Sequence, residues 1–188
     1  VSVQQGETWN AAPFSAQRAF LEQTYPAFHA AAKREVVNGE SLLFTWQGSD
    51  ASLPPILLLA HMDVVPVESW SSEDWTNGPF SGAVKDGYVW GRGAIDDKGS
   101  LISILEAAEA LAKSGFKPRR TILFAFGHDE EVSGRQGAQS MAKMLKERGV
   151  KAWFALDEGQ AIIATHPLTG TPVSLIGVAE KGYATLLV

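Results

Sequence analysis

The sequence of 188 residues contains no cysteine, which excludes disulfide bonds and thiolate metal ligands. It also lacks an apolar run long enough to span a bilayer, and its first residues do not resemble a signal peptide. We therefore expect no membrane segment within these residues. The compartment stays open between cytoplasmic and exported, and any metal must be held by histidine and carboxylate side chains.

Basic residues are few and scattered, with 16 Lys and Arg against 21 Asp and Glu, for a formal net charge of −5. Because no basic cluster is present, we expect neither nucleic acid nor an anionic membrane surface as a partner. A content of 45% hydrophobic and 20% charged residues is typical of a globular chain, so we expect one domain or most of one.

Short apolar runs alternate with amphipathic segments along most of the chain. We predict buried strands at residues 56–63, 120–126 and 152–156 and helices at residues 100–113 and 136–148. Strands that alternate with helices imply right-handed crossover connections. The predicted fold class is therefore α/β, a mainly parallel mixed sheet with helices on both faces.

Further elements are predicted around this alternation. A first helix is expected to be capped by Ser15 and ended by Pro26, and turns are expected at Asn38-Gly39 and Asp86-Gly87. Glu106 and Glu109 fall off the apolar stripe of their helix, which predicts a solvated face. Additional strand-like runs are found at residues 161–164, 173–178 and 183–188.

The long loop at residues 65–81 carries Trp70, Trp75 and Phe80. A loop of this length is uncommon without a role. Its aromatic rings fit two interpretations equally well, a cover over the edge of the core or the wall of a substrate pocket.

Polar clusters follow the three predicted buried strands, and another precedes a helix. They are His61-Met62-Asp63, Asp129-Glu130-Glu131, Asp157-Glu158 and Asp96-Asp97. Because the carboxyl ends of parallel strands share one edge of a sheet, we expect these acids to converge. Crowded carboxylates repel one another unless cations are present. One histidine among several carboxylates suits zinc, with cobalt and manganese as alternatives, and a bridging carboxylate would allow a dinuclear hydrolase centre.

Other polar residues receive simpler interpretations. Residues 91–99 are rich in glycine, but they lack the Gly-Lys-Ser/Thr ending of a phosphate loop and hold two acids where a phosphate would lie. We therefore do not expect nucleotide binding at this segment. His128 is expected to cap or support its loop, and Asp129 to stabilise it. His29 and His166 are interpreted as structural or exposed.

Five motifs resemble a known family of dinuclear zinc metallopeptidases. They are HMDVVP at residues 61–66, WTNGPFSG, GRGAIDDKG at 91–99, GHDEEVSGRQGA at 127–138 and LDEG at 156–159. The family includes aminoacylase, glutamate carboxypeptidase and succinyl-diaminopimelate desuccinylase, and the resemblance covers about residues 42–188. The motif at 127–138 and the VAEKG segment look most like the branch of vacuolar carboxypeptidase S and the N-acyl-amino-acid hydrolases.

The resemblance implies a set of metal ligands. His61 would bind one zinc ion, Asp96 would bridge both ions, and Glu131 would bind the other. The next ligand would be either Asp157 or Glu158, because neighbouring strand residues face opposite ways. The family's last ligand is a histidine in a longer chain, and no motif for it occurs here.

The resemblance also implies the catalytic roles. Asp63 would orient His61, and Glu130 would be the general base that passes a proton from the attacking water to the departing amine. The Asp96-Asp97 peptide bond is expected to be cis, as in the family. Substrate-binding residues are not predicted.

On this resemblance, residues 1–180 would form the N-terminal part of the catalytic domain and residues 181–188 the start of a lid domain, which often dimerises. The expected function is hydrolysis, by zinc-activated water, of an amide bond in N-acyl amino acids or at the C-terminus of small peptides. The alternative is an inactive fragment or pseudo-enzyme that acts as a binding or assembly module. We expect these 188 residues alone to have little or no peptidase activity.

Overall fold

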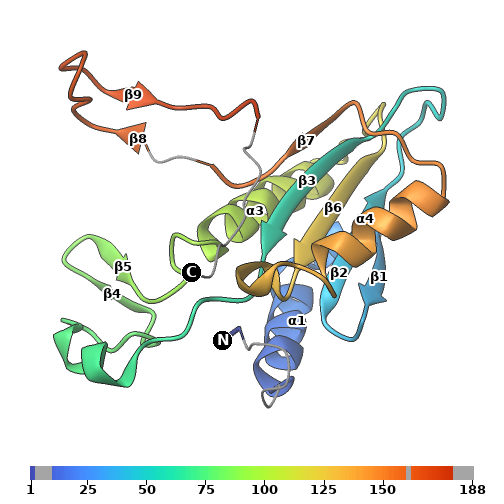
Figure 1. Cartoon of the computed structure of the whole chain (residues 1–188). Helices are drawn as coiled ribbons and strands as arrows, with labels where there is room; N and C mark the ends of the chain where they lie inside the picture. The colour runs from blue at the N-terminus through green and yellow to red at the C-terminus, as the bar shows by residue number, and fades with distance from the viewer. Residues whose placement is uncertain (3–9, 160–161, 180–188) are drawn as a thin grey trace, which may run out of the picture. The chain divides into compact units, whose positions relative to one another are not determined.

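The computed structural model describes residues 1–2, 10–159 and 162–179 (Figure 1). The chain forms two compact units, Val1–Leu156 and Asp157–Val188. The predicted domain boundary at residue 180 falls on residues outside those described, so it stays a prediction. Among the helices in the described part of the chain, none has the length and apolar character needed to cross a bilayer.

The first unit is built on a five-stranded sheet. Its strands, in spatial order, are β1 (Lys33–Val37), β2 (Ser41–Trp46), β6 (Ile122–Gly127), β3 (Ile56–His61) and β7 (Phe154–Leu156). Strand β2 is antiparallel to both β1 and β6, whereas β3 is parallel to both β6 and β7. Four strands therefore run in one direction and only β2 opposes them, which confirms the prediction of a mainly parallel mixed sheet.

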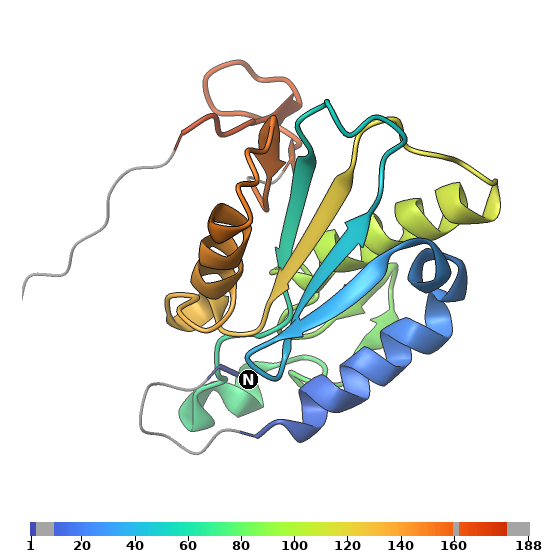
Figure 2. The same cartoon turned by 90° about the vertical axis from the view of Figure 1, so that its right-hand side faces the viewer.

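Helices cover both faces of this sheet, as predicted (Figure 2). They are α1 (Ala12–Thr24), α2 (Pro26–Ala31) and α3 (Lys98–Lys113) on one face and α4 (Ala138–Glu147) on the other. Side chains alternate along a strand, so neighbouring residues of β2 belong to different layers. Phe44 packs with the helices of the first face, whereas Leu43 packs against Met141 of α4.

Two of the strands that were predicted to be buried are more exposed than expected. Residues 56–59 of β3 are only half-buried, and β7 is exposed along its length, with Leu156 at 56% exposure. Among the described strands β7 lies at the edge of the sheet, so it has a strand neighbour on one side only. The apolar run correctly predicted a strand, but the run alone does not distinguish a central strand from an edge strand.

The first helix begins earlier than predicted. It starts at Ala12, and Pro13 stands in its first turn, where proline's missing N–H is no loss. Ser15 is therefore a residue of the helix and not its cap. Pro26 ends α1 as predicted, but it also starts α2.

Glu109 contradicts the predicted solvated face of α3, because its side chain is buried. Its carboxylate accepts hydrogen bonds from the backbone N–H groups of Phe28 (2.7 Å) and Ala27 (3.3 Å) at the start of α2. Glu106 is exposed, as predicted, and accepts a hydrogen bond from the hydroxyl of Tyr25. Glu109 thus caps a helix that lies far away in the sequence.

Both predicted turns form. Asn38 and Gly39 have φ angles of 48° and 88° between β1 and β2, and Asp86 and Gly87 have 54° and 80° between β4 (Ala83–Lys85) and β5 (Tyr88–Trp90). Asparagine, aspartate and glycine tolerate this left-handed backbone better than other residues. The long loop contains a short 3-10 helix, η1 (Ser69–Asp74).

The three aromatic residues of that loop lie in different surroundings, and the choice between the two interpretations stays open. Trp70 is 78% exposed, so it does not cover the core. Phe80 lines a largely apolar cavity of about 530 Å³ together with Phe14 and Met62. Trp75 packs under the guanidinium of Arg92, 5.4 Å from its ring centroid.

In the described residues of the second unit, β8 (Ile162–Ile163) pairs antiparallel with β9 (Val173–Ser174) in a hairpin. These strands fall within two of the predicted strand-like runs, although each is shorter than predicted. The third run, at residues 183–188, lies outside the described residues.

Candidate metal centre

His61 is the last residue of β3 and is brought to the carboxyl edge of the sheet. It lies opposite Gly127 of β6 in the parallel register, so the segments that follow the two strands start at the same edge. Its imidazole is buried, with Nε2 2.8 Å from Asp96 Oδ1 and 3.9 Å from Glu130 Oε2. The predicted convergence of His61 with acids from two other segments is therefore present.

Asp63 lies on the other side of the imidazole. Its Oδ1 is 3.3 Å from His61 Nδ1, and the side chain is fully buried. The backbone N–H groups of Glu130 and Glu131 donate to its two oxygens at 3.1 and 3.2 Å. Burial opposes ionisation of this carboxyl, but hydrogen bonds from His61, Ser2 and the Glu130 amide hold its pKa below the usual value.

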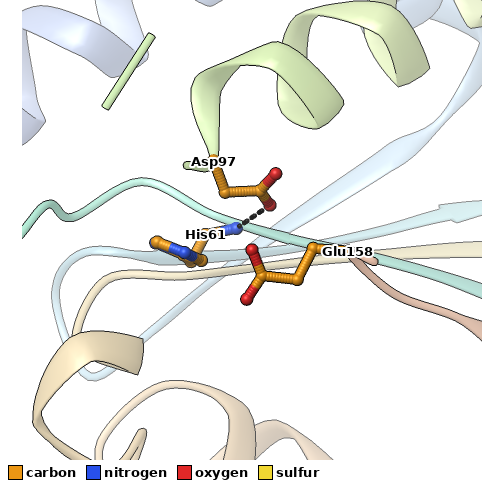
Figure 3. Close-up of side chains that lie close together, drawn as sticks. All are labelled: His61, Asp97 and Glu158. Carbon is orange, nitrogen blue, oxygen red and sulfur yellow. Dashed lines mark hydrogen bonds between the residues drawn. The ribbon is translucent and has the colours of Figure 1, made fainter. Parts of the chain in front are cut away.

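The Asp96-Asp97 segment directly precedes α3, and its peptide bond is cis, as expected. Asp97 is 1% exposed and accepts a hydrogen bond from the backbone N–H of His61 at 3.1 Å (Figure 3). The next residue, Lys98, donates from Nζ to the carbonyl of Met62 at 2.8 Å. Hydrogen bonds to the N–H of His61 and to the carbonyl of Met62 therefore hold the start of α3 against the end of β3.

Glu130 and Glu131 lie in a short 3-10 helix, η2 (Glu130–Val132). One ligand atom from each, together with a nitrogen of His61, lie within 4.8 Å of one another. Burial and then the negative charges of neighbouring acids raise the pKa of Glu130, although His61 opposes this shift. Burial and the charge of Asp96 raise the pKa of Glu131 in the same way.

Part of these pKa shifts comes from the negative charges of neighbouring acids, which lie close together at the site. A divalent cation removes such repulsion and favours the ionised carboxylates. An imidazole nitrogen and carboxylate oxygens are donors that zinc accepts in proteins. The group formed by His61, Glu130 and Glu131 thus fits a metal ion in both spacing and chemistry.

The model of peptidase family M20/M25/M40 matches residues 57–173, more than half of the chain, and this range includes the candidate metal centre. The chain belongs to this family. The resemblance of its motifs to the aminoacylase and carboxypeptidase metallopeptidases is thereby confirmed.

Individual M20 relatives are similar along most of the chain. It is 45% identical over 166 residues to a probable carboxypeptidase S-like 2 of Dictyostelium discoideum, which covers 87% of this chain and 32% of that protein. It is 45% identical over 170 residues to an N-fatty-acyl-amino acid synthase/hydrolase of Xenopus tropicalis, covering 89% and 33%. For carboxypeptidase S of Saccharomyces cerevisiae the values are 44% over 172 residues, 87% and 29%. The chain thus spans about a third of the length of these relatives.

Solved M20 structures share the fold. An M20 family metallo-carboxypeptidase from Sulfolobus solfataricus superposes with a TM-score of 0.62 at 21% identity, over 79% of this chain and 33% of that one. Human carnosine dipeptidase 1 gives 0.58 at 20% identity, over 81% and 35%. At such low identities the likeness concerns the fold, and it agrees with the mixed sheet and its two helical layers.

Asp157 and Glu158, the two candidates for a further ligand, belong to the second unit of this M20 chain. The backbone N–H of Glu158 donates to Asp157 Oδ1 at 3.0 Å. Which of the two binds metal stays a prediction.

The remaining residues of the acidic loop have the supporting roles predicted for them. Asp129 is buried and accepts hydrogen bonds from the backbone N–H groups of Gln136 (2.7 Å) and Gly137 (2.8 Å), which stabilises the loop. His128 Nδ1 lies 2.6 Å from the hydroxyl of Ser41, and burial lowers its pKa.

Two residues at the site have roles that the sequence did not predict. Asp97 was expected to converge with the other acids, but not to hold the backbone of His61, whose N–H donates to its carboxylate. Ser2 lies outside every predicted element and motif, yet it is buried and lies 2.7 Å from Asp63 Oδ2. For Asp97 its place beside Asp96 was a signal, whereas no local pattern marks Ser2.

Proposed function

We propose that this chain is part of the catalytic domain of a zinc-dependent hydrolase that cleaves amide bonds. The observation that carries the proposal is the meeting of His61 with Asp96, Glu130 and Glu131 at one edge of the sheet in a chain of the M20 family. Its substrates would be N-acyl amino acids or small peptides cleaved at the C-terminus. Relatives named as carboxypeptidases and as an N-fatty-acyl-amino acid hydrolase support this choice.

The proposed metal ligands are those expected from the resemblance. His61 would hold one zinc ion, Asp96 would bridge two, and Glu131 would hold the second, with Asp157 or Glu158 as a further ligand. Two observations support the first three assignments. His61 Nε2 lies 2.8 Å from Asp96 Oδ1, and a nitrogen of His61 lies within 4.8 Å of a carboxylate oxygen of Glu131. When bound, zinc supplies Lewis acidity, which polarises the scissile carbonyl and makes water a better nucleophile at neutral pH.

Glu130 is the proposed general base. It would accept a proton from the attacking water and return it to the nitrogen of the departing amine. Its carboxylate is about half exposed, so water can reach it, while its backbone N–H is fixed on Asp63 at 3.1 Å.

Glu130→Gln tests the assignment of the base in the complete protein, with zinc content and hydrolysis of N-acyl amino acids and dipeptides measured together. We expect kcat to fall about 100- to 10,000-fold because proton transfer is lost. Zinc content should be retained, because the proposed ligands are unchanged. The matched control is Glu147→Gln on α4, an exposed glutamate that pairs only loosely with Lys143 at 3.9 Å. Unchanged turnover in Glu130→Gln would overturn the assignment.

A further inference from the structure

Asp63, the proposed partner of His61, receives hydrogen bonds from distant parts of the chain. Its Oδ1 faces His61 Nδ1 and the N–H of Glu130. Its Oδ2 accepts the N–H of Glu131 at 3.2 Å and the hydroxyl of Ser2 at 2.7 Å. Ser2 makes the shortest of these contacts and lies 61 residues away in sequence.

Ser2 is held in place independently of this contact. Its backbone N–H donates to the carbonyl of Val64 at 2.9 Å, and its hydroxyl oxygen also lies 2.9 Å from that carbonyl. The residue is 6% exposed. A substitution that removes only the hydroxyl therefore leaves the backbone attachment of this segment intact.

We infer that Ser2 is a positioning residue of the metal centre, acting through Asp63. Without the Ser2 hydroxyl, Asp63 Oδ2 would keep only the 3.2 Å hydrogen bond from the Glu131 N–H. A buried carboxylate that loses its shortest hydrogen bond rotates or admits water to regain one. Rotation of Asp63 would withdraw its carboxylate from His61 Nδ1, which would keep only its 3.1 Å contact with the backbone carbonyl of Asp63. It would also withdraw the carboxylate from the N–H groups of Glu130 and Glu131. His61 and the segment that carries Glu131 both supply proposed metal ligands, and both would then lose the carboxylate that orients them.

A purely structural role predicts something different. If the hydroxyl only satisfied a buried polar group, its removal would lower the free energy of unfolding and leave the metal affinity of the folded protein unchanged. Metal affinity is therefore the readout that separates the two roles. The inference rests on the proposed zinc centre, so the unmodified protein must be measured alongside the variants.

The experiment measures Zn²⁺ affinity by competition with a chromophoric chelator, and folding by circular dichroism. In Ser2→Ala we expect the dissociation constant for Zn²⁺ to rise about 10- to 100-fold, the range found for residues that support metal ligands. Ser2→Thr should bind as the unmodified protein does. Thr121→Val is the control for loss of a hydroxyl away from the site. Thr121 Oγ1 accepts the N–H of Gly48 next to the opposite end of β6. The Zn²⁺ affinity of this variant should equal that of the unmodified protein.

Ser2→Thr and Ser2→Val form a further pair with the same shape, so their difference isolates the hydroxyl even where both lose stability. Equal Zn²⁺ affinity in this pair, or in Ser2→Ala and the unmodified protein, would overturn the positioning role while leaving the metal centre standing. Absence of Zn²⁺ binding in the unmodified protein would instead overturn the metal centre itself.

Discussion

At the scale of single residues, the close approach of two backbone segments decides which substitutions are tolerated near the site. Gly93 has a φ of +82°, and a Cβ at this position would lie 2.2 Å from Cγ1 of Val64. Val64 follows Asp63 directly and is buried. The loop before α3 can therefore lie against the end of β3 only because position 93 carries no side chain.

Gly93→Ala is predicted to be strongly destabilising, by about 3 kcal/mol, because it combines backbone strain with a collision in the core. Gly87→Ala separates the two causes, since Gly87 has a φ of +80° but nothing within 4 Å of an added Cβ. That control should lose only about 1 kcal/mol. Midpoints and slopes of urea unfolding measure both values. Similar losses in the two variants would show that the contact with Val64 is unimportant.

At the scale of elements, α2 depends on a residue that is distant in sequence. The first N–H groups of a helix have no partner within it, and α2 has no side-chain cap of its own. The carboxylate of Glu109 on α3 meets the N–H groups of Phe28 and Ala27, and Lys113 lies 3.1 Å from the same carboxylate. Burial alone would raise the pKa of Glu109, but these interactions outweigh it and lower the pKa.

Glu109→Gln should destabilise the first unit by about 1 to 2 kcal/mol at pH 7, because hydrogen bonds to a charged acceptor are replaced by neutral ones. The folded pKa of Glu109 lies below the unfolded value, so its contribution is complete above about pH 4.5 and is lost as the pH falls through the folded pKa. Unfolding by denaturant at several pH values between about 7 and 3 measures the difference between the two proteins. Glu147→Gln, at an exposed glutamate of α4, is the control. A difference that stays constant over this range would contradict the role of the charge.

The elements differ in how well the sequence predicts them, and contact distance along the chain explains why. Asn38-Gly39 and Asp86-Gly87 were predictable because the turn depends on residues within it. Glu109 was misassigned because its partners on α2 lie 81 and 82 residues away, and helical periodicity carries no information about them. The exposure of β7 was missed for the same reason, since it depends on the order of strands in the sheet.

At the scale of the whole molecule, the sheet makes most of the site predictable. Once β3 and β6 are known to be parallel, His61 and the acids after Gly127 must share one edge. The contribution of Ser2 lies outside such reasoning, because the chain reaches Asp63 from a segment with no regular pattern. Topology therefore predicts which candidate ligands meet, whereas the contacts that hold them in place are visible only in three dimensions.

The same topology links metal binding to stability. His61, Asp96 and Glu131 come from three segments of the first unit, so a metal that binds all three binds the folded chain in preference to the unfolded one. Zinc at about 100 times its dissociation constant should add about 2.7 kcal/mol and raise the midpoint of thermal unfolding, and a chelator should reverse the shift. His61→Ala should abolish the shift, whereas His166→Ala, a histidine of the second unit, should retain it. A midpoint that does not respond to zinc, or one that responds equally in His61→Ala, would show that these residues do not form a metal centre.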